Sequence, residues 1–246
     1  MVRRIGLSVL IAASLLAGAC GGSGSGSQGA ATTTSTSVAA GSVAPESTSV
    51  TSKAAADEAL VRSVLLRASD VPGWTGSGDP TPPSAEDEAD SAAMGTCMGL
   101  PTTKPDVDLQ SPSFEKGDSQ VQGDVYTYDD QSIVDRYEAA LPTKGVACLT
   151  QMLTDTLRRE LGSTVTVSAP TIRRIGPAID GRGSKLTFSM VVTEPATGRK
   201  MSFGGAFTSV SVGRLVVEAQ VFTTGGTVPM ADLDRAMAAQ FGRAPH

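Results

Sequence analysis

Residues 185–222 read KLTFSMVVTEPATGRKMSFGGAFTSVSVGRLVVEAQVF, and this stretch decides the fold. Apolar and polar residues alternate along three segments of it, which are separated by a turn at Pro195–Gly198 and by Gly213. Alternation with a period of two is typical of a strand that buries one face. The apolar positions are, in order, Leu186, Phe188, Met190, Val192, Met201, Phe203, Phe207, Leu215, Val217, Ala219 and Val221. The stretch therefore predicts an antiparallel meander of three strands.

More elements are expected on either side of this meander. A hairpin is predicted over 113–128, with Gly117-Asp118 as its turn, and a further strand over 164–172. Apolar residues at spacings of three and four predict a first helix over 54–68 and a closing helix after Val228-Pro229. These elements together indicate an α+β fold with two layers, in which helices pack on one face of an antiparallel sheet.

A central helical region is expected to begin at Asp129-Asp130 and to run to Leu161. An adjacent carboxylate pair could act in acid–base chemistry, but capping of the helix by one of these residues is the ordinary explanation. Pro142 and Gly145 predict a break between two helical segments.

The first residues of the chain predict export. Arg3 and Arg4 precede an apolar run from Ile5 to Leu16, which is too short to span a bilayer because a span needs about 20 residues. The run leads into Ala17-Gly18-Ala19-Cys20. This motif resembles the bacterial lipobox, which implies cleavage between Ala19 and Cys20 and a lipid on the Cys20 thiol. The alternative is an ordinary secreted protein that is cut nearby.

Three regions follow from this reading. Residues 1–19 are a lipoprotein signal peptide, 20–53 a lipidated cysteine with a disordered Gly/Ser/Thr/Ala tether, and 54–246 one globular domain. A flexible tether of this length spans about 30 Å on average. We therefore expect a protein held at the cell membrane by its lipid and facing the extracytoplasmic side.

The other two cysteines, Cys97 and Cys148, are expected to form a disulfide. An oxidising compartment favours pairing, and the pairing leaves no odd thiol once Cys20 carries lipid. A zinc site would need three or four ligands and a catalytic thiol would need a base, whereas the single histidine of the chain is the terminal His246.

Composition excludes several classes of function. The net charge of −5, without a long run of Lys or Arg, argues against a nucleic-acid partner. No internal histidine is present for a catalytic triad or a histidine-based metal site, and no phosphate-binding glycine motif occurs. The acidic cluster at Glu86, Asp87, Glu88 and Asp90 lacks the spacing of a calcium loop and is predicted to be a solvated face. We therefore expect no enzyme, cofactor or metal.

The order of the predicted elements resembles that of a known group of proteins. The motif Ser69-Asp70-Val71-Pro72-Gly73-Trp74 follows a leading helix, and a cysteine, a hairpin, a helix with Cys148, a meander and a closing helix come after it. Over about 54–243 this layout resembles actinobacterial lipoproteins, and their similarity to the extracellular sensor domain of the mycobacterial PknH-type kinases implies binding or sensing.

Three functions are carried forward. The first is a sensor or binding module for an envelope ligand or protein partner, with Trp74, the single tryptophan, as the one candidate ligand contact. The alternatives are a lipid or lipoglycan carrier, which needs a large apolar cavity, and a structural envelope protein that docks through an outer sheet face.

Overall fold

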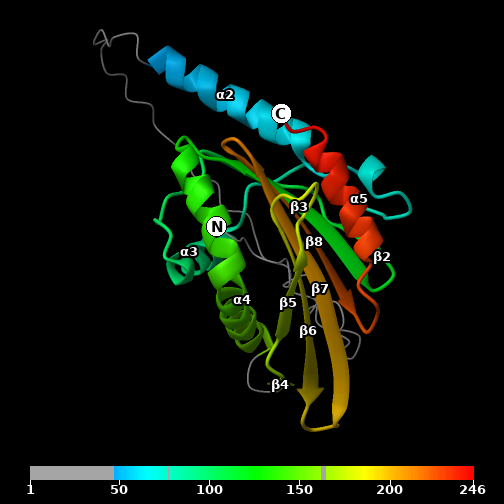
Figure 1. Ribbon diagram of the computed structural model, residues 1–246. Helices are drawn as coiled ribbons and strands as arrows, with labels where there is room; N and C mark the ends of the chain where they lie inside the picture. The colour runs from blue at the N-terminus through cyan, green and yellow to red at the C-terminus, as the bar shows by residue number, and fades with distance from the viewer. Residues whose placement is uncertain (1–46, 77, 162–164) are drawn as a thin grey trace, which may run out of the picture.

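The computed structural model describes residues 47–76, 78–161 and 165–246 (Figure 1). The predicted signal peptide, the lipobox-like motif with Cys20 and the predicted tether as far as residue 46 lie outside the described residues. None of the described helices combines the length and the apolar character that a bilayer span requires.

The described elements confirm an α+β fold with an antiparallel sheet. Its helical elements are α2 Ser47–Val64, the 3-10 turn η2 Ala68–Asp70, α3 Ala85–Met98, α4 Gln131–Leu161 and α5 Met230–Phe241. Its strands are β1 Val107–Gln110, β2 Phe114–Lys116, β3 Ser119–Thr127, β4 Thr166–Val167, β5 Thr171–Gly176, β6 Ser184–Glu194, β7 Arg199–Val212 and β8 Leu215–Thr224.

These strands form one eight-stranded sheet within the described part of the chain. The order is β1-β3-β8-β7-β6-β4, with β2 paired to β3 and β5 paired to β6. The predicted meander is confirmed as β6, β7 and β8. The predicted hairpin is confirmed as β2 and β3, which turn at Gly117 with a φ of +60°.

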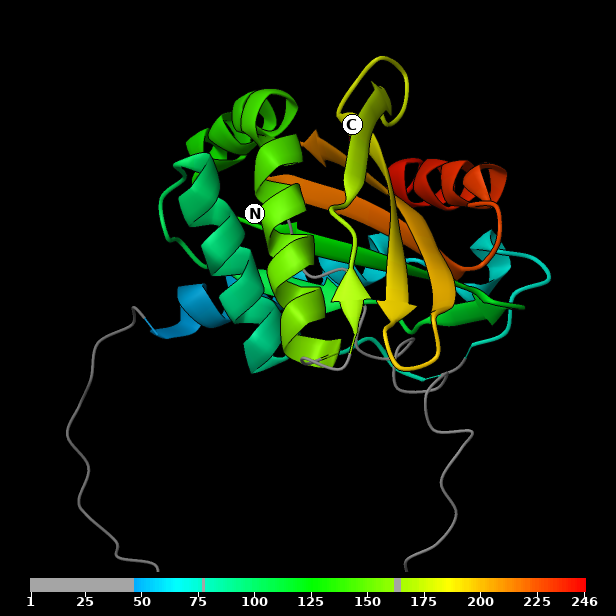
Figure 2. The ribbon, with the colours of Figure 1, turned by 90° about the horizontal axis from the view of Figure 1, so that it is seen from below.

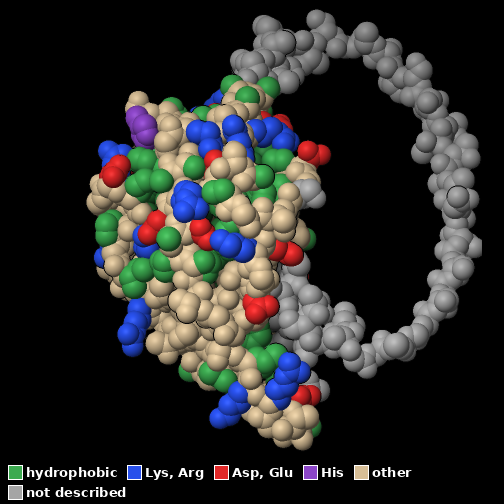
Figure 3. Space-filling view, turned by 90° about the vertical axis from the view of Figure 1, so that its right-hand side faces the viewer, with side chains coloured by type: hydrophobic (Ala, Val, Ile, Leu, Met, Phe, Trp, Pro, Cys, Tyr) green, Lys and Arg blue, Asp and Glu red, His purple; other side chains and the backbone are tan. Residues whose placement is uncertain are grey.

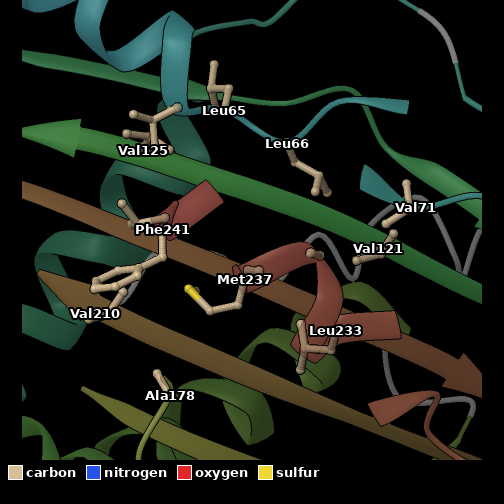
Figure 4. Packing of buried hydrophobic residues seen from close by; sticks show 14 of the residues in the cluster. Leu65, Leu66, Val71, Val121, Val125, Ala178, Val210, Leu233, Met237 and Phe241 are labelled. Atoms are coloured by element: carbon tan, nitrogen blue, oxygen red, sulfur yellow. The ribbon is translucent and has the colours of Figure 1, made fainter. Parts of the chain in front are cut away.

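Helices cover both faces of the sheet, whereas the alternation of apolar and polar residues predicted helices on one face only. Figure 2 shows α3 and α4 on one side of the strands and α5 on the other. Two separate apolar clusters result: Tyr126, Val216 and Phe222 pack with α4, whereas Val125 and Val217 pack with α2 and α5. Figure 4 shows part of the second cluster, where Leu233, Met237 and Phe241 of α5 face the sheet.

The reason for the second helical layer lies in β8. Its two alternating sets of side chains are both buried, because Val216 and Phe222 are as apolar as Leu215 and Val217. A strand that buries both faces needs a cover on each.

The acidic cluster that was predicted to be a solvated face lies at the start of helix α3, an element that the sequence analysis did not predict. Ser84 caps the helix: the Ser84 hydroxyl accepts from the Asp87 N–H, and the Asp87 carboxylate accepts from the Ser84 N–H. The acidic residues therefore occupy a first helical turn, where the helix dipole favours negative charge. The helix ends at Gly99, which adopts a φ of +75°.

Helix α4 is continuous through Pro142 and Gly145, so the predicted break is wrong. Asp130 caps its start, as expected, by accepting from the Ser132 N–H at 2.8 Å. Proline inside a helix removes one backbone hydrogen bond and costs about 3 kcal/mol. The buried side chains of Leu141 and Leu149, which flank Pro142, pack on the same apolar cluster and hold the helix together.

Helix α2 starts at Ser47, so residues 47–53, which were assigned to the tether, are helical. Lys53 lies against the carboxylates of Asp57 at 2.9 Å and Asp129, and Arg214 contacts Asp57 at 2.9 Å. These ion pairs hold the helix against the loop after β3 and the turn before β8. Local composition does not predict such tertiary contacts.

The disulfide between Cys97 and Cys148 is present and joins α3 to α4. Cys97 lies in the last turn of α3. The bridge therefore fixes one helix of this layer to its neighbour.

Replacement of both cysteines, Cys97→Ser with Cys148→Ser, is expected to lower the free energy of unfolding. The bridge closes a loop with a sequence separation of 51 residues, and constraint of such a loop in the unfolded chain contributes about 4 kcal/mol. Urea denaturation followed by circular dichroism measures the difference. An unchanged unfolding midpoint would show that the bridge does not stabilise the fold.

Candidate functional site

A pocket of about 360 Å³ opens beside α3, above the β1–β3 edge of the sheet. The residues that line it are Pro82, Pro83, Glu88, Ser91, Ala92, Thr102, Thr103, Lys104, Pro105, Asp106, Asp108 and Tyr126. One wall is thus a face of α3, and two connecting segments form the others. A volume of this size lies at the lower end of the range found for small-molecule sites, about 300–1,000 Å³.

The two connecting segments are held in place by the sheet. Thr81 and Gln110 exchange both backbone hydrogen bonds, at 3.0 and 2.8 Å. The Asp106 N–H donates to the Thr127 carbonyl at 2.9 Å. Pro82, Pro83 and Pro105 have restricted φ angles, so these walls lose little backbone freedom when a ligand enters. The pocket is therefore largely formed before binding.

A salt bridge crosses one side of the pocket. Lys104 Nζ lies 2.7 Å from Glu88 Oε2, and both side chains are well exposed. An exposed pair of this kind stabilises the fold by less than about 1 kcal/mol. The pair can therefore open at little cost, which leaves one cation and one carboxylate at the wall of the pocket for a polar ligand.

The floor of the pocket comes from the sheet. Asp108 on β1 and Tyr126 on β3 are direct cross-strand partners, so their side chains lie on the same face. The Tyr126 side chain is fully buried, and its hydroxyl donates to Glu218 Oε1 at 2.9 Å. The ring that closes the pocket is thus hydrogen-bonded to a carboxyl group in the interior.

Glu218 is the most unusual residue beneath the pocket. It is 1% exposed, and it also accepts a hydrogen bond from the Tyr137 hydroxyl of α4 at 2.8 Å. Its second oxygen, Oε2, has no hydrogen-bond partner among the described residues. Burial raises the pKa of Glu218 although two phenol donors favour its charged form. Loss of hydration therefore dominates at this carboxyl group.

Glu218 belongs to a polar row that crosses five strands under α3 and α4. The row follows the register of the sheet, in which each residue is the direct partner of the next. Its members are Gln110, Asp124, Glu218, Ser209 and Ser184, and all five are buried. Gln220 reaches Asp124 with a donor–acceptor distance of 3.5 Å. A buried row of this kind requires one strand register, because a slip by one residue would place each side chain on the other face.

Trp74 does not line this pocket. It is 7% exposed and lies in the apolar cluster on the other face of the sheet. Its indole N–H donates to Asp232 at 3.1 Å, and Lys116 Nζ lies 5.7 Å from the ring centroid. Trp74 is therefore a core residue whose polar atom has a hydrogen-bond partner. This residue, the candidate ligand contact of the sequence analysis, lies away from the pocket described here.

No family model matches the chain, and no curated protein matches it. Among solved structures, it is similar to the extracellular domain of PknH from Mycobacterium tuberculosis, with a TM-score of 0.40 and 12% sequence identity. The similarity covers 76% of this chain and 95% of that chain.

Replacement of the buried carboxyl group, Glu218→Gln, is expected to stabilise the protein relative to the parent as the pH rises. Because the folded protein raises the pKa of Glu218, its contribution is present below the ordinary glutamate pKa and is lost as the pH rises through the raised value. The neutral amide keeps an acceptor for Tyr126 and does not ionise. The gain is about 1.4 kcal/mol for each tenfold increase in proton affinity over the unfolded chain.

Urea denaturation between pH 4 and pH 8 measures this difference. Glu115→Gln is the matched control, because it removes one carboxylate from an exposed position, and the difference for Glu218→Gln is expected to grow with pH relative to it. A difference for Glu218→Gln that stays constant across the range would contradict a raised pKa.

Proposed function

We propose that the protein is a lipid-anchored, extracytoplasmic binding module that senses a small ligand of the cell envelope in the pocket beside α3. The single observation that carries the binding role is this pocket, whose proline-bearing walls are fixed to the sheet and whose floor is hydrogen-bonded to Glu218. A preformed pocket reduces the conformational cost of binding.

The anchor and the compartment are supported by the sequence and by one structural feature. The motif that ends at Cys20 supports lipid attachment at the membrane. The disulfide between Cys97 and Cys148 agrees with an oxidising, extracytoplasmic compartment. The tether after Cys20 would let the folded domain stand away from the membrane.

A binding role is favoured over catalysis by the chemistry of the site. The carboxyl group of Glu218 is fully enclosed and cannot touch a substrate, because general acid–base catalysis needs a direct contact or one bridging water. The single histidine, His246, packs against Phe241 with ring centroids 4.7 Å apart. These features support binding over catalysis at this pocket.

A lipid or lipoglycan carrier is the alternative within the binding class. A carrier site would have to be lined by side chains such as Leu, Val and Phe. The prolines, Ala92 and Tyr126 give this pocket a mostly apolar lining, to which Lys104 and three carboxylates add charge, and its volume of about 360 Å³ favours a small amphipathic ligand over a lipid with long acyl chains. A structural envelope protein that docks on a protein partner is the second alternative, and it would need no ligand here.

A variant that fills the pocket tests the binding role. Ala92→Trp is expected to abolish ligand binding, because Ala92 is an exposed α3 residue that lines the pocket and lies outside the core. The matched control is Ala93→Trp, one residue further along the same helix and also exposed, but absent from the lining of this pocket.

The measurement is native mass spectrometry after incubation with a small-molecule extract of the producing organism's envelope. We expect a bound mass on the parent and on the Ala93→Trp variant, and none on the Ala92→Trp variant. Equal binding by all three proteins would exclude this pocket, and a bound mass that proves to be a long-chain lipid would favour the carrier.

Replacement of the lipobox cysteine, Cys20→Ser, is expected to release the protein from the membrane without unfolding the domain. The serine hydroxyl does not take the thioether-linked lipid, and one or more acyl chains provide the proposed anchorage. Fractionation of cells followed by immunoblotting measures the distribution between membrane and soluble fractions. A variant that remains in the membrane fraction to the same extent as the parent would contradict lipid anchoring.

A further inference from the structure

The charge of the pocket beside α3 indicates which class of ligand it would take. This inference rests on the proposed function, because it concerns the same pocket. Four charged side chains line the pocket: Glu88, Lys104, Asp106 and Asp108. Three of them are carboxylates and one is an ammonium group, so the lining carries a net charge of −2 at neutral pH.

The three carboxylates come from two sides of the pocket. Asp106 and Asp108 are two residues apart in an extended segment, because the Asp106 N–H donates to the Thr127 carbonyl and Asp108 lies in β1. Their side chains therefore leave the sheet on the same face, with Cα atoms about 7 Å apart. Glu88 lies on α3, one helical turn before Ala92 of the pocket wall. A positively charged group in the pocket would lie between carboxylates of the helix and of the sheet.

The charges behind the pocket do not neutralise this excess. Lys53 Nζ lies 3.7 Å from the Asp106 carboxylate. However, Lys53 and Arg214 also contact the carboxylates of Asp57 and Asp129. These two cations and two carboxylates cancel one another, so the net charge of the lining remains.

Helix α3 adds further negative charge to the same side. It carries Glu86, Asp87, Glu88 and Asp90 and no basic residue, and Arg159 of α4 contacts only two of them, Glu86 and Asp90. The positive end of the helix dipole corresponds to about half a charge, so it cannot reverse the sign. Figure 3, which views the molecule from the right of Figure 1, shows Lys and Arg spread among Asp and Glu. That side mixes both signs, whereas carboxylates dominate at the pocket.

The state of Asp106 agrees with a shortage of positive charge. The pKa of its carboxyl group is raised, first by burial and then by the neighbouring carboxylate of Asp129. The surroundings thus disfavour its negative charge although the Lys53 ammonium group is near. A second cation on the pocket side of Asp106 would supply the missing compensation.

We propose that the pocket binds a small amphipathic organic cation, with a primary ammonium or guanidinium group on a short apolar body. The cationic group would lie among Glu88, Asp106 and Asp108, to which its N–H groups can donate charge-assisted hydrogen bonds. The apolar body would pack on the prolines and on Ala92. An anion of the same shape would be repelled by the net negative lining.

Three probes of similar shape and different charge test this proposal. They are phenethylamine, phenethyl alcohol and hydrocinnamate, titrated into the ¹⁵N-labelled mature chain, residues 20–246 with Cys20→Ser. Chemical shifts give the dissociation constants. We expect phenethylamine to bind at least about tenfold more tightly than the alcohol, the range of one hydrogen bond to a charged group, and hydrocinnamate to bind most weakly. Added salt is expected to weaken the amine alone.

Removal of the lysine at the pocket is expected to strengthen binding. Lys104→Gln deletes the cation that competes for Glu88, so phenethylamine should bind about threefold more tightly, within the range of an exposed ion pair. Lys200→Gln is the matched control, because Lys200 is exposed on β7 and does not line the pocket. Equal affinity of the two variants for phenethylamine would contradict the proposal.

Removal of carboxylates is expected to have the opposite effect. Glu88→Gln with Asp108→Asn should weaken phenethylamine at least about tenfold and leave phenethyl alcohol nearly unchanged, since the apolar walls remain. Glu115→Gln with Asp118→Asn deletes the same charge at the β2–β3 hairpin and should change neither. Retained binding of the alcohol shows that the pocket of the first double variant is intact, and circular dichroism checks that both variants are folded.

Four further results would overturn the proposal. They are binding of the alcohol or of hydrocinnamate as tight as that of phenethylamine, equal weakening in the two double variants, no binding of phenethylamine at millimolar concentration, and full binding of phenethylamine by the Ala92→Trp variant. The last result would place the amine outside this pocket. The measurement with envelope extract decides the proposed function separately, because it detects a ligand of any charge.

Discussion

Burial of both faces of β8 is the constraint on which the rest of the structure depends. Its neighbours β3 and β7 pair with it along nearly its whole length, so β8 has neither an exposed edge nor an exposed face. One apolar set, which includes Val217 and Val221, requires the layer of α2 and α5. The other set, with Val216 and Phe222, requires α4, to which the disulfide secures α3.

The same constraint creates the polar row under the candidate pocket. Glu218 lies between Val216 and Phe222 on the face that α4 covers, so its carboxyl group is enclosed as soon as that helix packs. Two tyrosine hydroxyls compensate part of the lost hydration, and the pKa of Glu218 remains raised by its burial. Because Tyr126 also forms part of the pocket floor, its hydrogen bond to Glu218 connects the pocket with the buried polar row.

The sequence predicted the positions of the strands better than it predicted which of their side chains are buried. Alternation predicted β6, β7 and β8, since a period of two is a local property. Alternation could not show that Glu218 and Gln220 are buried, because polar side chains in a strand ordinarily face water. Ser84, with Asp87 three residues later, is a local signal for the start of α3 in the sequence. Continuity of α4 through Pro142 depends on tertiary packing.

The candidate site could not be predicted, because it depends on register. Asp108, Tyr126 and Glu218 meet only when β1, β3 and β8 are aligned, and no local pattern specifies that alignment. Trp74 attracted attention as the single tryptophan, yet its surroundings are those of a core residue. The near absence of histidine and the lipobox-like motif, by contrast, can be read from the sequence alone.

The most direct test of the account is nuclear magnetic resonance of the protein labelled with ¹³C at the ζ carbon of tyrosine, during titration with envelope extract. The chain has three tyrosines, Tyr126, Tyr128 and Tyr137, so each signal can be assigned by substitution. The account predicts that ligand binding shifts the Tyr126 signal most, followed by Tyr137, which shares Glu218 with it. A ligand that binds while the Tyr126 signal stays unchanged would contradict a site above this residue.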